Sequence, residues 1–475
     1  MKRIATPTTN ALLAMALCLF MSACAVGPNY VRPKASVPET FKEAEGWKQS
    51  KPADTIPRGA WWKVFDDPQL NELEEQVNIS NQTIIAAEAQ YREALALVLV
   101  ARASYFPFVT GGASYTRSLG SSTLTRTQSA GGSPVSDYLL PVDLSWEADL
   151  WGRIRRTVET SRSNAQAAAA DLESVRLSAQ AALAQAYFQL RTVDAQIKLF
   201  TATVDAYKKA LELTENRYAS GVAAKSDILQ ADTQLKSAQA QLIDLGVQRA
   251  QLEHAIALFI GKAPSEFSLP SASAPLAPPS VPVGVPSELL ERRPDIAAAE
   301  RRVAAANAQI GVAKAAFFPK VTLSASGGYE SGNSATWLTW PSHFWSLGPA
   351  LTQTLFAGGS LRAVTAGARA AYDAAAASYR QTVLTGFQEV EDNLAALRIL
   401  EQEAAAQKEA VKAAEESLAL TLNQYRAGTV SYLNVIVAET TALSNERAEA
   451  DIAGRRMTAA ATLIKALGGG WQSTP

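Results

Sequence analysis

Residues 86–110 read AAEAQYREALALVLVARASYFPFVT, and residues 298–322 read AAERRVAAANAQIGVAKAAFFPKVT, with 12 identities in 25 aligned positions. A second pair of stretches, LELTENRYASG at Leu211–Gly221 and LALTLNQYRAG at Leu418–Gly428, is identical at 6 of 11 positions. The two offsets, 212 and 207 residues, nearly agree. The sequence therefore predicts one unit duplicated in tandem: helix, Phe-Pro, strands, long helix, turn, helix.

The composition excludes several classes of function. Lys and Arg number 44 against 45 Asp and Glu, so we expect no nucleic-acid partner. No apolar run long enough for a transmembrane helix follows the first 24 residues. The two histidines are far apart in sequence, and no Cys, His or carboxylate cluster has metal-ligand spacing. We predict no cofactor, no metal and no enzymatic activity; a secreted hydrolase would need a catalytic constellation that the sequence does not show.

The N-terminus is predicted to be a targeting segment. Lys2 and Arg3 precede an apolar stretch, and Met21-Ser22-Ala23-Cys24 resembles a bacterial lipobox. This resemblance implies that residues 1–23 are removed and that Cys24 carries fatty acyl chains such as palmitate. The alternative is an ordinary signal peptide with a bystander cysteine. Ala25 in place of Asp implies, by analogy with bacterial lipoproteins, sorting to the outer membrane.

The predicted organisation follows the repeat. An extended anchor segment rich in proline covers residues 24–65, and a Pro- and Ser-rich linker covers residues 263–286 between the repeats. A tail covers residues 468–475. The first repeat is 66–262, with helical segments 66–106 and 152–262 and a β-hairpin at 107–151; the second is 287–467, with helical segments 287–318 and 358–467 and a β-hairpin at 319–357.

Two periodicities define each repeat. One stretch has apolar residues at alternating spacings of four and three, which is typical of coiled-coil packing in a helix on the order of 100 Å long; it is Ala186, Leu190, Val193, Ile197, Phe200, Val204, Tyr207, Leu211, Thr214 and Tyr218. The copy at 360–427 contains Gly367 and Gly386, which we expect to interrupt it. Four other segments alternate with period two, which suits membrane strands: 109–116, 142–150, 321–330 and 345–355.

These strands are too few to close a barrel within one chain. An open sheet edge in lipid would leave backbone N–H and C=O groups unpaired, so membrane strands of this kind require oligomerisation. Two copies would supply eight strands and three copies twelve. The polar face of the second strand, with Asp143, Glu147 and Asp149, would line an aqueous lumen. The alternative is a half-buried sheet in a soluble protein.

Several motifs, in order along nearly the whole mature chain, resemble the outer membrane factor (TolC-like) family of tripartite efflux pumps and its NodT-type lipoproteins. They are CAVGPNYVRP (24–33), WWKVFDDPQLNEL (61–73), ELLERRPDIAAAERRVAAANAQIGVAKAAFFP (288–319), LFAGGSLR (355–362), YRAGTVSYLNV (425–435) and KALGGGW (465–471).

The resemblance implies a fold that is mainly α-helical with a membrane β-barrel portion. Each chain would form one third of a homotrimer with a twelve-stranded barrel in the outer membrane and a twelve-helix barrel in the periplasm. It implies a passive exit duct for drugs or other small molecules, served by a periplasmic adaptor and an inner membrane pump of the resistance–nodulation–division (RND) type. A type I secretion duct and a periplasmic coiled-coil scaffold or adaptor remain as alternatives, and the cargo stays open.

The resemblance also places the two N-x-Y-x-x-G turns at the periplasmic aperture, where the adaptor docks. The residues expected there are Tyr218, Gly221, Asp227, Tyr425, Arg426, Gly428 and Val430. We expect Tyr425→Ala or Arg426→Ala to raise channel conductance. Only the second turn has Arg426 and Tyr432, where the first has Ala219 and Lys225. This asymmetry predicts that the second hairpin is the moving part of a gate.

Overall fold

The computed structural model describes residues 25–35, 38, 40–43, 59–121, 133–272, 279 and 292–469. The predicted signal peptide and Cys24 lie outside these residues. The chain forms two compact units, each described by itself. The sheet unit comprises residues 1–34, 90–168 and 298–379, and the helix unit comprises 35–89, 169–297 and 380–475.

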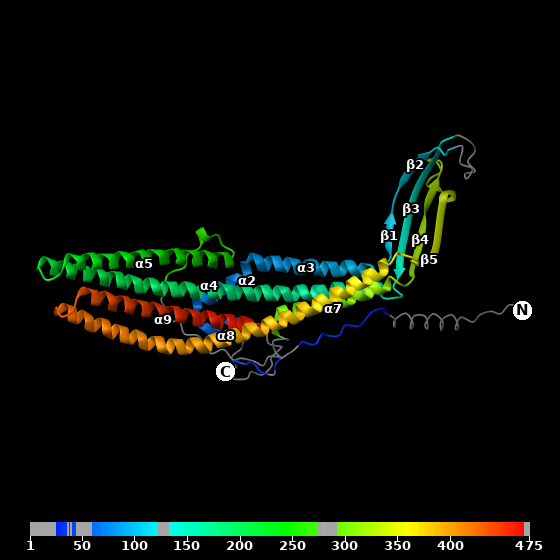
Figure 1. Cartoon of the computed structure of the whole chain (residues 1–475). Helices are drawn as coiled ribbons and strands as arrows, with labels where there is room; N and C mark the ends of the chain where they lie inside the picture. Colours follow the sequence, from blue (N-terminus) through cyan, green and yellow to red (C-terminus); the bar gives the residue numbers. More distant parts are fainter. Residues whose placement is uncertain are drawn as a thin grey trace. The chain divides into compact units, whose positions relative to one another are not determined.

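The sheet unit contains one antiparallel sheet (Figure 1). Its strands are β1 (Phe108–Gly111), β2 (Ser114–Ser118), β3 (Val135–Ala148), β4 (Lys320–Ser331) and β5 (His343–Thr352). Both β1 and β2 pair with β3, so they are two parts of one expected strand, and β4 lies between β3 and β5. The two predicted hairpins therefore join side by side through the β3–β4 pairing.

A proline and a glycine face each other in the middle of this sheet. Pro141 of β3 is opposite Gly328 of β4. A Cβ on Gly328 would lie 2.0 Å from the Leu140 carbonyl oxygen, so only glycine fits this approach. Pro141 lacks an N–H, but its carbonyl oxygen accepts a hydrogen bond of 3.1 Å from Gly112 N, between β1 and β2. Because Pro141 is tolerated here, β3 begins at Val135, earlier than the expected Val142.

Long helices make up most of the described chain (Figure 1). They are α2 (Pro68–Ser80), α3 (Gln82–Ala103), α4 (Arg153–Ala219), α5 (Lys225–Phe259), α7 (Pro294–Ala315), α8 (Ser360–Arg426) and α9 (Tyr432–Ala466). Short 3₁₀ turns lie at η1 (Trp61–Phe65), η2 (Pro264–Glu266) and η3 (Trp340–Ser342). The expected interruption at Gly367 and Gly386 was wrong, because α8 continues through both glycines.

Side-chain caps set the boundaries of the first helices. Asp67 Oδ1 accepts hydrogen bonds from Gln69 N and Leu70 N, at 2.9 and 3.1 Å, and Pro68 occupies the first helical position, as predicted. Asn81 then separates α2 from α3, because its Oδ1 accepts from Thr83 N at 3.0 Å and so restarts the helix. The helical segment expected over 66–106 is therefore two helices.

The predicted heptad residues of α4 form much of the helix-unit core. Leu190, Val193, Phe200, Val204 and Tyr207 are all buried. Val204 and Tyr207 pack against Leu235 and Ala238 of α5, while Val193 and Phe200 pack against Leu245. The spacing of four and three thus places one face of α4 against α5, as in a coiled coil.

A buried charge network fixes the start of the linker against α4 and α5. Asp194 accepts hydrogen bonds from Arg191 Nη1 and Arg249 Nε, at 3.1 and 2.8 Å. Arg249 also donates to the Leu269 carbonyl oxygen at 2.6 Å, and Leu269 N donates to Glu253 at 2.5 Å. Four charged side chains therefore hold the start of the predicted Pro- and Ser-rich linker: Asp194, Arg191, Arg249 and Glu253.

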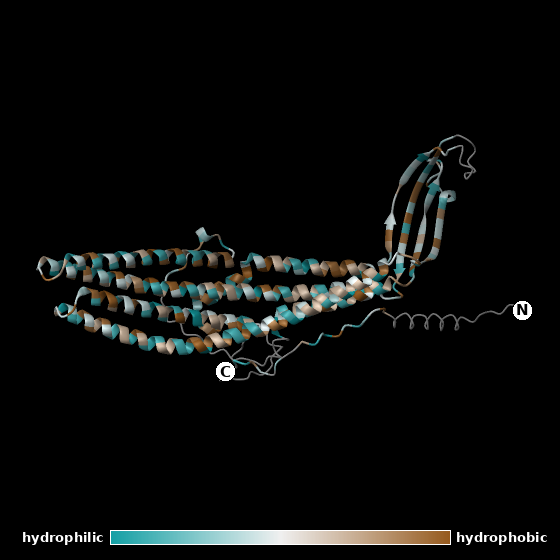
Figure 2. Cartoon of the chain, in the orientation of Figure 1, coloured by the Kyte–Doolittle hydropathy of each residue, from teal (hydrophilic) through white to brown (hydrophobic). Residues whose placement is uncertain are grey.

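The helices are mixed in hydropathy along their whole length. Figure 2 shows hydrophilic and hydrophobic residues interleaved on each long helix. Among the described residues, no helix is long and apolar enough to cross a membrane.

Candidate functional site: the tips of the helical hairpins

The helix unit contains two helical hairpins, the first formed by α4 and α5 and the second by α8 and α9. Their turns have the same backbone hydrogen bonds. At the end of α4, Val222 N donates to the Arg217 carbonyl oxygen at 2.9 Å, and Gly221 N donates to that of Tyr218 at 2.9 Å. The end of α8 repeats this pair of bonds with Gly428 in the place of Gly221. The two glycines have φ of +75° and +78°, the left-handed conformation that this helix-ending motif requires.

Arg217 of the first hairpin contacts the end of α8 in the second. Its Nη1 donates to the carbonyl oxygens of Tyr425 and Arg426, at 2.8 and 3.3 Å. The guanidinium carbon lies 4.5 Å from the centroid of the Tyr425 ring. The last carbonyls of a helix have no intrahelical donor and carry partial negative charge, so a cation stabilises them. Arg217 therefore joins the two hairpins by a charged hydrogen bond and a cation–π contact.

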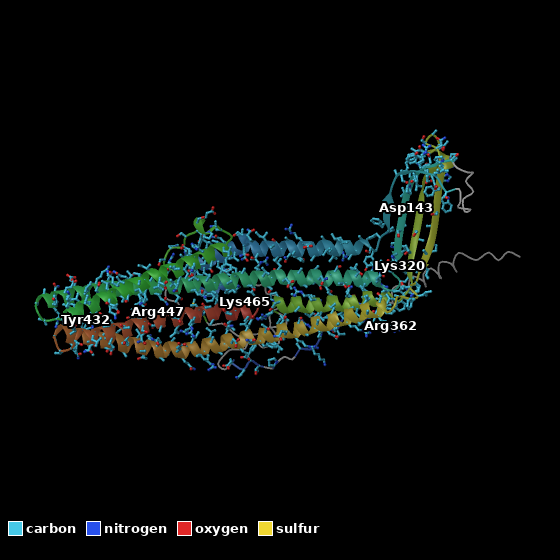
Figure 3. The ribbon with its side chains drawn as sticks, turned by 45° about the horizontal axis from the view of Figure 1, so that its top comes forward. Asp143, Lys320, Arg362, Tyr432, Arg447 and Lys465 are labelled. Atoms are coloured by element: carbon cyan, nitrogen blue, oxygen red, sulfur yellow. The ribbon has the colours of Figure 1, made fainter. Side chains whose placement is uncertain are left out.

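Two tyrosines form the apolar part of the same site. Tyr425 and Tyr432 are 3% and 2% exposed, and their ring centroids lie 5.4 Å apart. They form one cluster with Ala231 of α5 and Val435 of α9. Burial raises the pKa of the Tyr432 hydroxyl above its ordinary value, with carboxylates and neighbouring tyrosines adding to the shift. Tyr432 lies on α9 near the turn (Figure 3).

The residues predicted from the turns differ in what they do. Tyr425 is at the centre of the contact, and Val430 packs against the tyrosine cluster. Tyr218 is 45% exposed, although it occupies the same motif position as Tyr425. Asp227 caps α5, because its Oδ2 accepts a hydrogen bond from Ala224 N at 3.3 Å. Arg426 is exposed and contributes its backbone carbonyl to the contact with Arg217.

Sequence reasoning missed Arg217 and Thr214 as members of the site. Thr214 was included only as part of the heptad; it is fully buried, and its Oγ1 lies 3.4 Å from the Tyr425 hydroxyl. Arg217 is the variable residue of the first N-x-Y-x-x-G motif, where the second has Gln424. Arg217 could have been identified from the sequence, because it is a cation in the last turn of a helix and precedes the tyrosine of the motif.

The three acids expected on the polar strand face have different surroundings. Asp143 lies on β3 and is exposed (Figure 3). Glu147 also lies on β3, but Arg153 and Lys320 pair with it at 2.8 and 3.1 Å. Asp149 lies beyond the end of β3, so its expected place in the strand was wrong. Its carboxylate caps α4 by accepting from Ile154 N and Arg155 N, at 2.9 Å each.

The first described residues are held firmly within the sheet unit. Val26 N donates to the Trp151 carbonyl oxygen at 3.0 Å, and Arg156 Nη2 donates to Asn29 Oδ1 at 3.0 Å. A Cβ on Gly27 would lie 2.5 Å from the Gly311 Cα, so the backbone itself packs against α7. The chain directly after Cys24 therefore lies beside Trp151, which stacks on Phe318 with centroids 4.7 Å apart.

The described residues offer no place for a bound metal. No group of three or more His, Cys, Asp or Glu in this part of the chain is arranged to hold one. What the described hairpin tips show is contact between helices, through Arg217 and the tyrosine cluster.

Comparison with known proteins gives a consistent result. The family model described as "Outer membrane efflux protein" matches residues 73–262 and 285–469. The probable efflux pump outer membrane protein TtgC of Pseudomonas putida is 30% identical over 98% of this chain and 96% of its own length. The outer membrane protein OprJ of Pseudomonas aeruginosa is 32% identical over 96% and 95%. The solved outer-membrane channel OprN has 34% identity and a TM-score of 0.86, over 94% of this chain and 100% of that one.

These matches confirm the predicted fold class and the resemblance drawn from the motifs. The family is one of efflux channels rather than enzymes. The chain belongs to the outer membrane efflux protein family and is an outer membrane channel component of an efflux system.

Proposed function

We propose that three copies of this chain form a passive exit duct across the periplasm and outer membrane, with no catalytic step of its own. The main support is the strand order of the sheet, in which β1 and β2 form one edge and β5 forms the other. Each outer strand lacks a partner on one edge among the described residues. In lipid, those edges need strands from another chain.

The direction of the strands supports closure by copies of the same chain. Because neighbours are antiparallel along the path, β5 runs opposite to β1, and the β5 of one copy can pair antiparallel with the β1 and β2 of the next. Three copies of this four-strand path give twelve strands. Three apolar side chains of β5 are more than half exposed in the single chain and suit a lipid-facing surface: Trp345, Leu347 and Leu351.

The names of the relatives support a proposal about partners. Two relatives from Pseudomonas putida are named as outer membrane proteins of efflux pumps: ArpC of an antibiotic efflux pump and TtgC of a toluene efflux pump. We infer that a periplasmic adaptor docks at the hairpin tips of this chain and that an RND-type inner membrane pump delivers small molecules to it. The Arg217–Tyr425 contact would then hold the aperture shut until the adaptor binds.

We also propose that acyl chains on Cys24 anchor the protein in the outer membrane. The support is that hydrogen bonds hold Val26 and Asn29, shortly after Cys24 in the sequence, to Trp151 and Arg156, where β3 is followed by α4 in the sheet unit. Aromatic side chains favour the membrane interface. Labelling with a radioactive fatty acid should be lost in Cys24→Ser and retained in wild type; equal labelling of both would exclude this anchor.

The duct proposal is tested by native mass spectrometry and planar-bilayer recording of the detergent-extracted full chain. A mass of three chains together with discrete single-channel steps is expected. A monomeric mass without pores would instead support a periplasmic scaffold, and would overturn the proposal. Pores formed by an assembly with a different number of chains would support the duct function but reject the proposed trimer.

A further inference from the structure

Glu439 occupies a core position of α9, close to the hairpin tip. Together with Tyr432, Val435 and Ala442 it forms a stripe at spacings of three and four, and all four are buried. Glu439 is 7% exposed. Its Oε2 is inaccessible and has no hydrogen-bond partner in the described part of the chain. A carboxyl group at such a position must be neutral or leave a buried charge unpaired.

The groups around Glu439 do not favour its charged form. The nearby groups include two buried phenols, Tyr207 of α4 and Tyr432, which lies two turns before Glu439 on α9. Burial raises the pKa of both hydroxyls, and the Glu439 carboxylate adds to each shift. Asp227 of α5 acts on Tyr432 in the same direction. Glu446, two turns further along α9, has a pKa raised by burial and by neighbouring carboxylates. Burial alone raises the pKa of Glu439 to about 7.

The remaining groups near this position come from α8 and α9. Tyr425 of α8 contacts Tyr432 and also raises the pKa of its hydroxyl. Arg447 of α9 lies two turns beyond Glu439 and lines a cavity next to it. Burial is the only cause of the shift in Glu439, so neither group offsets it.

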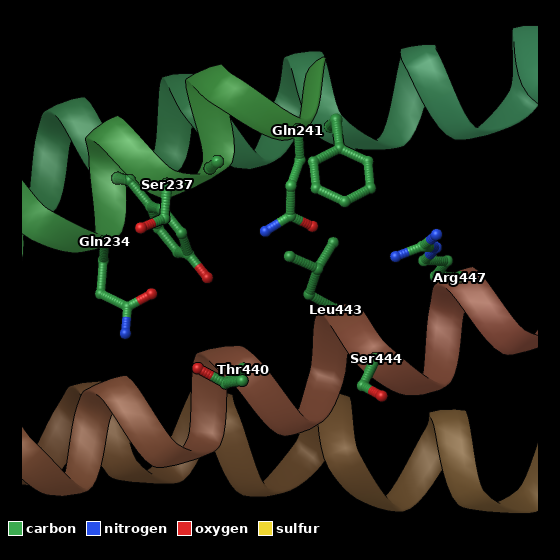
Figure 4. A pocket seen from close by; sticks show the side chains of 10 residues that line it. Gln234, Ser237, Gln241, Thr440, Leu443, Ser444 and Arg447 are labelled. Carbon is green, nitrogen blue, oxygen red and sulfur yellow. The ribbon is translucent and has the colours of Figure 1, made fainter. Parts of the chain in front are cut away.

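The cavity gives water a route to this part of the interface. It has a volume of about 220 Å³ and lies between α4, α5 and α9. Tyr207, Thr440 and Arg447 line it, together with Gln234 and Gln241 of α5 (Figure 4). Thr440, which lines the cavity, follows Glu439 directly in the chain, and Tyr207, which also lines it, lies close enough for the Glu439 carboxylate to raise its pKa further. If α9 moves away from α4 and α5, the carboxylate becomes hydrated here.

We propose that Glu439 is a proton-operated latch between the two helical hairpins: neutral, it lets α9 pack against α4 and α5, and ionised, it favours their separation. The proposal rests on the proposed duct function, because this interface carries Tyr432 and Val435, which hold Tyr425 at the tip. The second hairpin is then the moving part, and the trimer opens more readily as the pH rises.

The direction of the pH effect on the packed interface follows from the linkage between proton binding and stability. The packed state raises the pKa of Glu439 above its ordinary value of 4.5, to about 7. The packed interface is therefore most stable below the ordinary value and is progressively weakened as the pH rises through 7. One proton per chain limits the change in the open-to-closed ratio to about tenfold per pH unit for each hairpin.

The test is single-channel recording of the full-length assembly from about pH 5 to about pH 8.5, which brackets ionisation of a shifted carboxyl. Wild type should show an open probability that rises several-fold with pH. Glu439→Gln, which keeps the shape but cannot ionise, should remain at the low-pH level throughout. Glu449→Gln is the matched control, because Glu449 is an exposed acid on the same helix, and its profile should equal that of wild type.

Two results would overturn the latch. One is a wild-type open probability that does not change over this pH range. The other is a Glu439→Gln profile that follows the wild-type curve. Glu439→Leu provides a second uncharged variant should the first fail to assemble, as judged by mass and helical circular dichroism. Absence of any pore in wild type would instead count against the duct function.

Discussion

Arg217 of the first helical hairpin lies over the ring of Tyr425 in the second, with 4.5 Å between guanidinium carbon and ring centroid. The same guanidinium donates a hydrogen bond of 2.8 Å to the Tyr425 carbonyl oxygen. The two N-x-Y-x-x-G motifs have similar sequences, but they contact each other through different residues. The first repeat supplies the cation, and the second supplies the buried ring and the helix end.

Both turn glycines should resist substitution. Gly221→Ala and Gly428→Ala place a Cβ at positive φ, which should cost about 1 kcal/mol per turn. We expect a lower melting temperature of the assembly in each case. Gly246→Ala is the control, since Gly246 lies inside α5 with open space around it and alanine should stabilise a helix by up to about 1 kcal/mol. Equal effects at all three positions would contradict the role of the turns.

Asp149 should affect the stability of the protein, and Asp143 should affect the ion selectivity of the proposed channel. Asp149→Ala removes the side chain that caps α4, at a cost of about 0.5–2 kcal/mol in the free energy of unfolding. Asp143→Asn should leave stability unchanged, because Asp143 is exposed. An acid that lines the proposed lumen attracts cations, so this variant should also have a lower cation-to-anion permeability ratio, measured from reversal potentials. An Asp149→Ala variant as stable as wild type would exclude the capping role.

Asp194 should be essential to the buried charge network that holds the start of the linker against α4 and α5. Asp194→Asn removes the charge between two arginines, Arg191 and Arg249, and leaves their charges in or near the core. Breaking a buried ion pair in this way costs about 3–5 kcal/mol. We expect a large loss of thermal stability and faster proteolysis after Leu269. Asp205→Asn is the control, since its pair with Lys208 is exposed, and it should have little effect.

Much of this architecture could be predicted because it depends on local pattern. The repeat, the heptads and the positive-φ glycines are visible as spacing and residue type, and the helix cap at Asp67-Pro68 is a local signal. Asp149 was misplaced because capping and strand alternation both accept an acid at that position. The different burial of Tyr218 and Tyr425 depends on how one hairpin packs against the other, which sequence spacing does not specify.

Substitutions of Arg217 and Arg426 test whether contact between the two helical hairpins closes the channel tip. Arg217→Ala removes a charged hydrogen bond worth about 1.5–3 kcal/mol, so the open-to-closed ratio should rise about ten- to 150-fold in single-channel recordings. Arg426→Ala keeps the carbonyl that Arg217 binds and should behave as wild type, contrary to the expectation from sequence. An unchanged open-to-closed ratio in Arg217→Ala, or a raised ratio only in Arg426→Ala, would show that this contact does not close the tip.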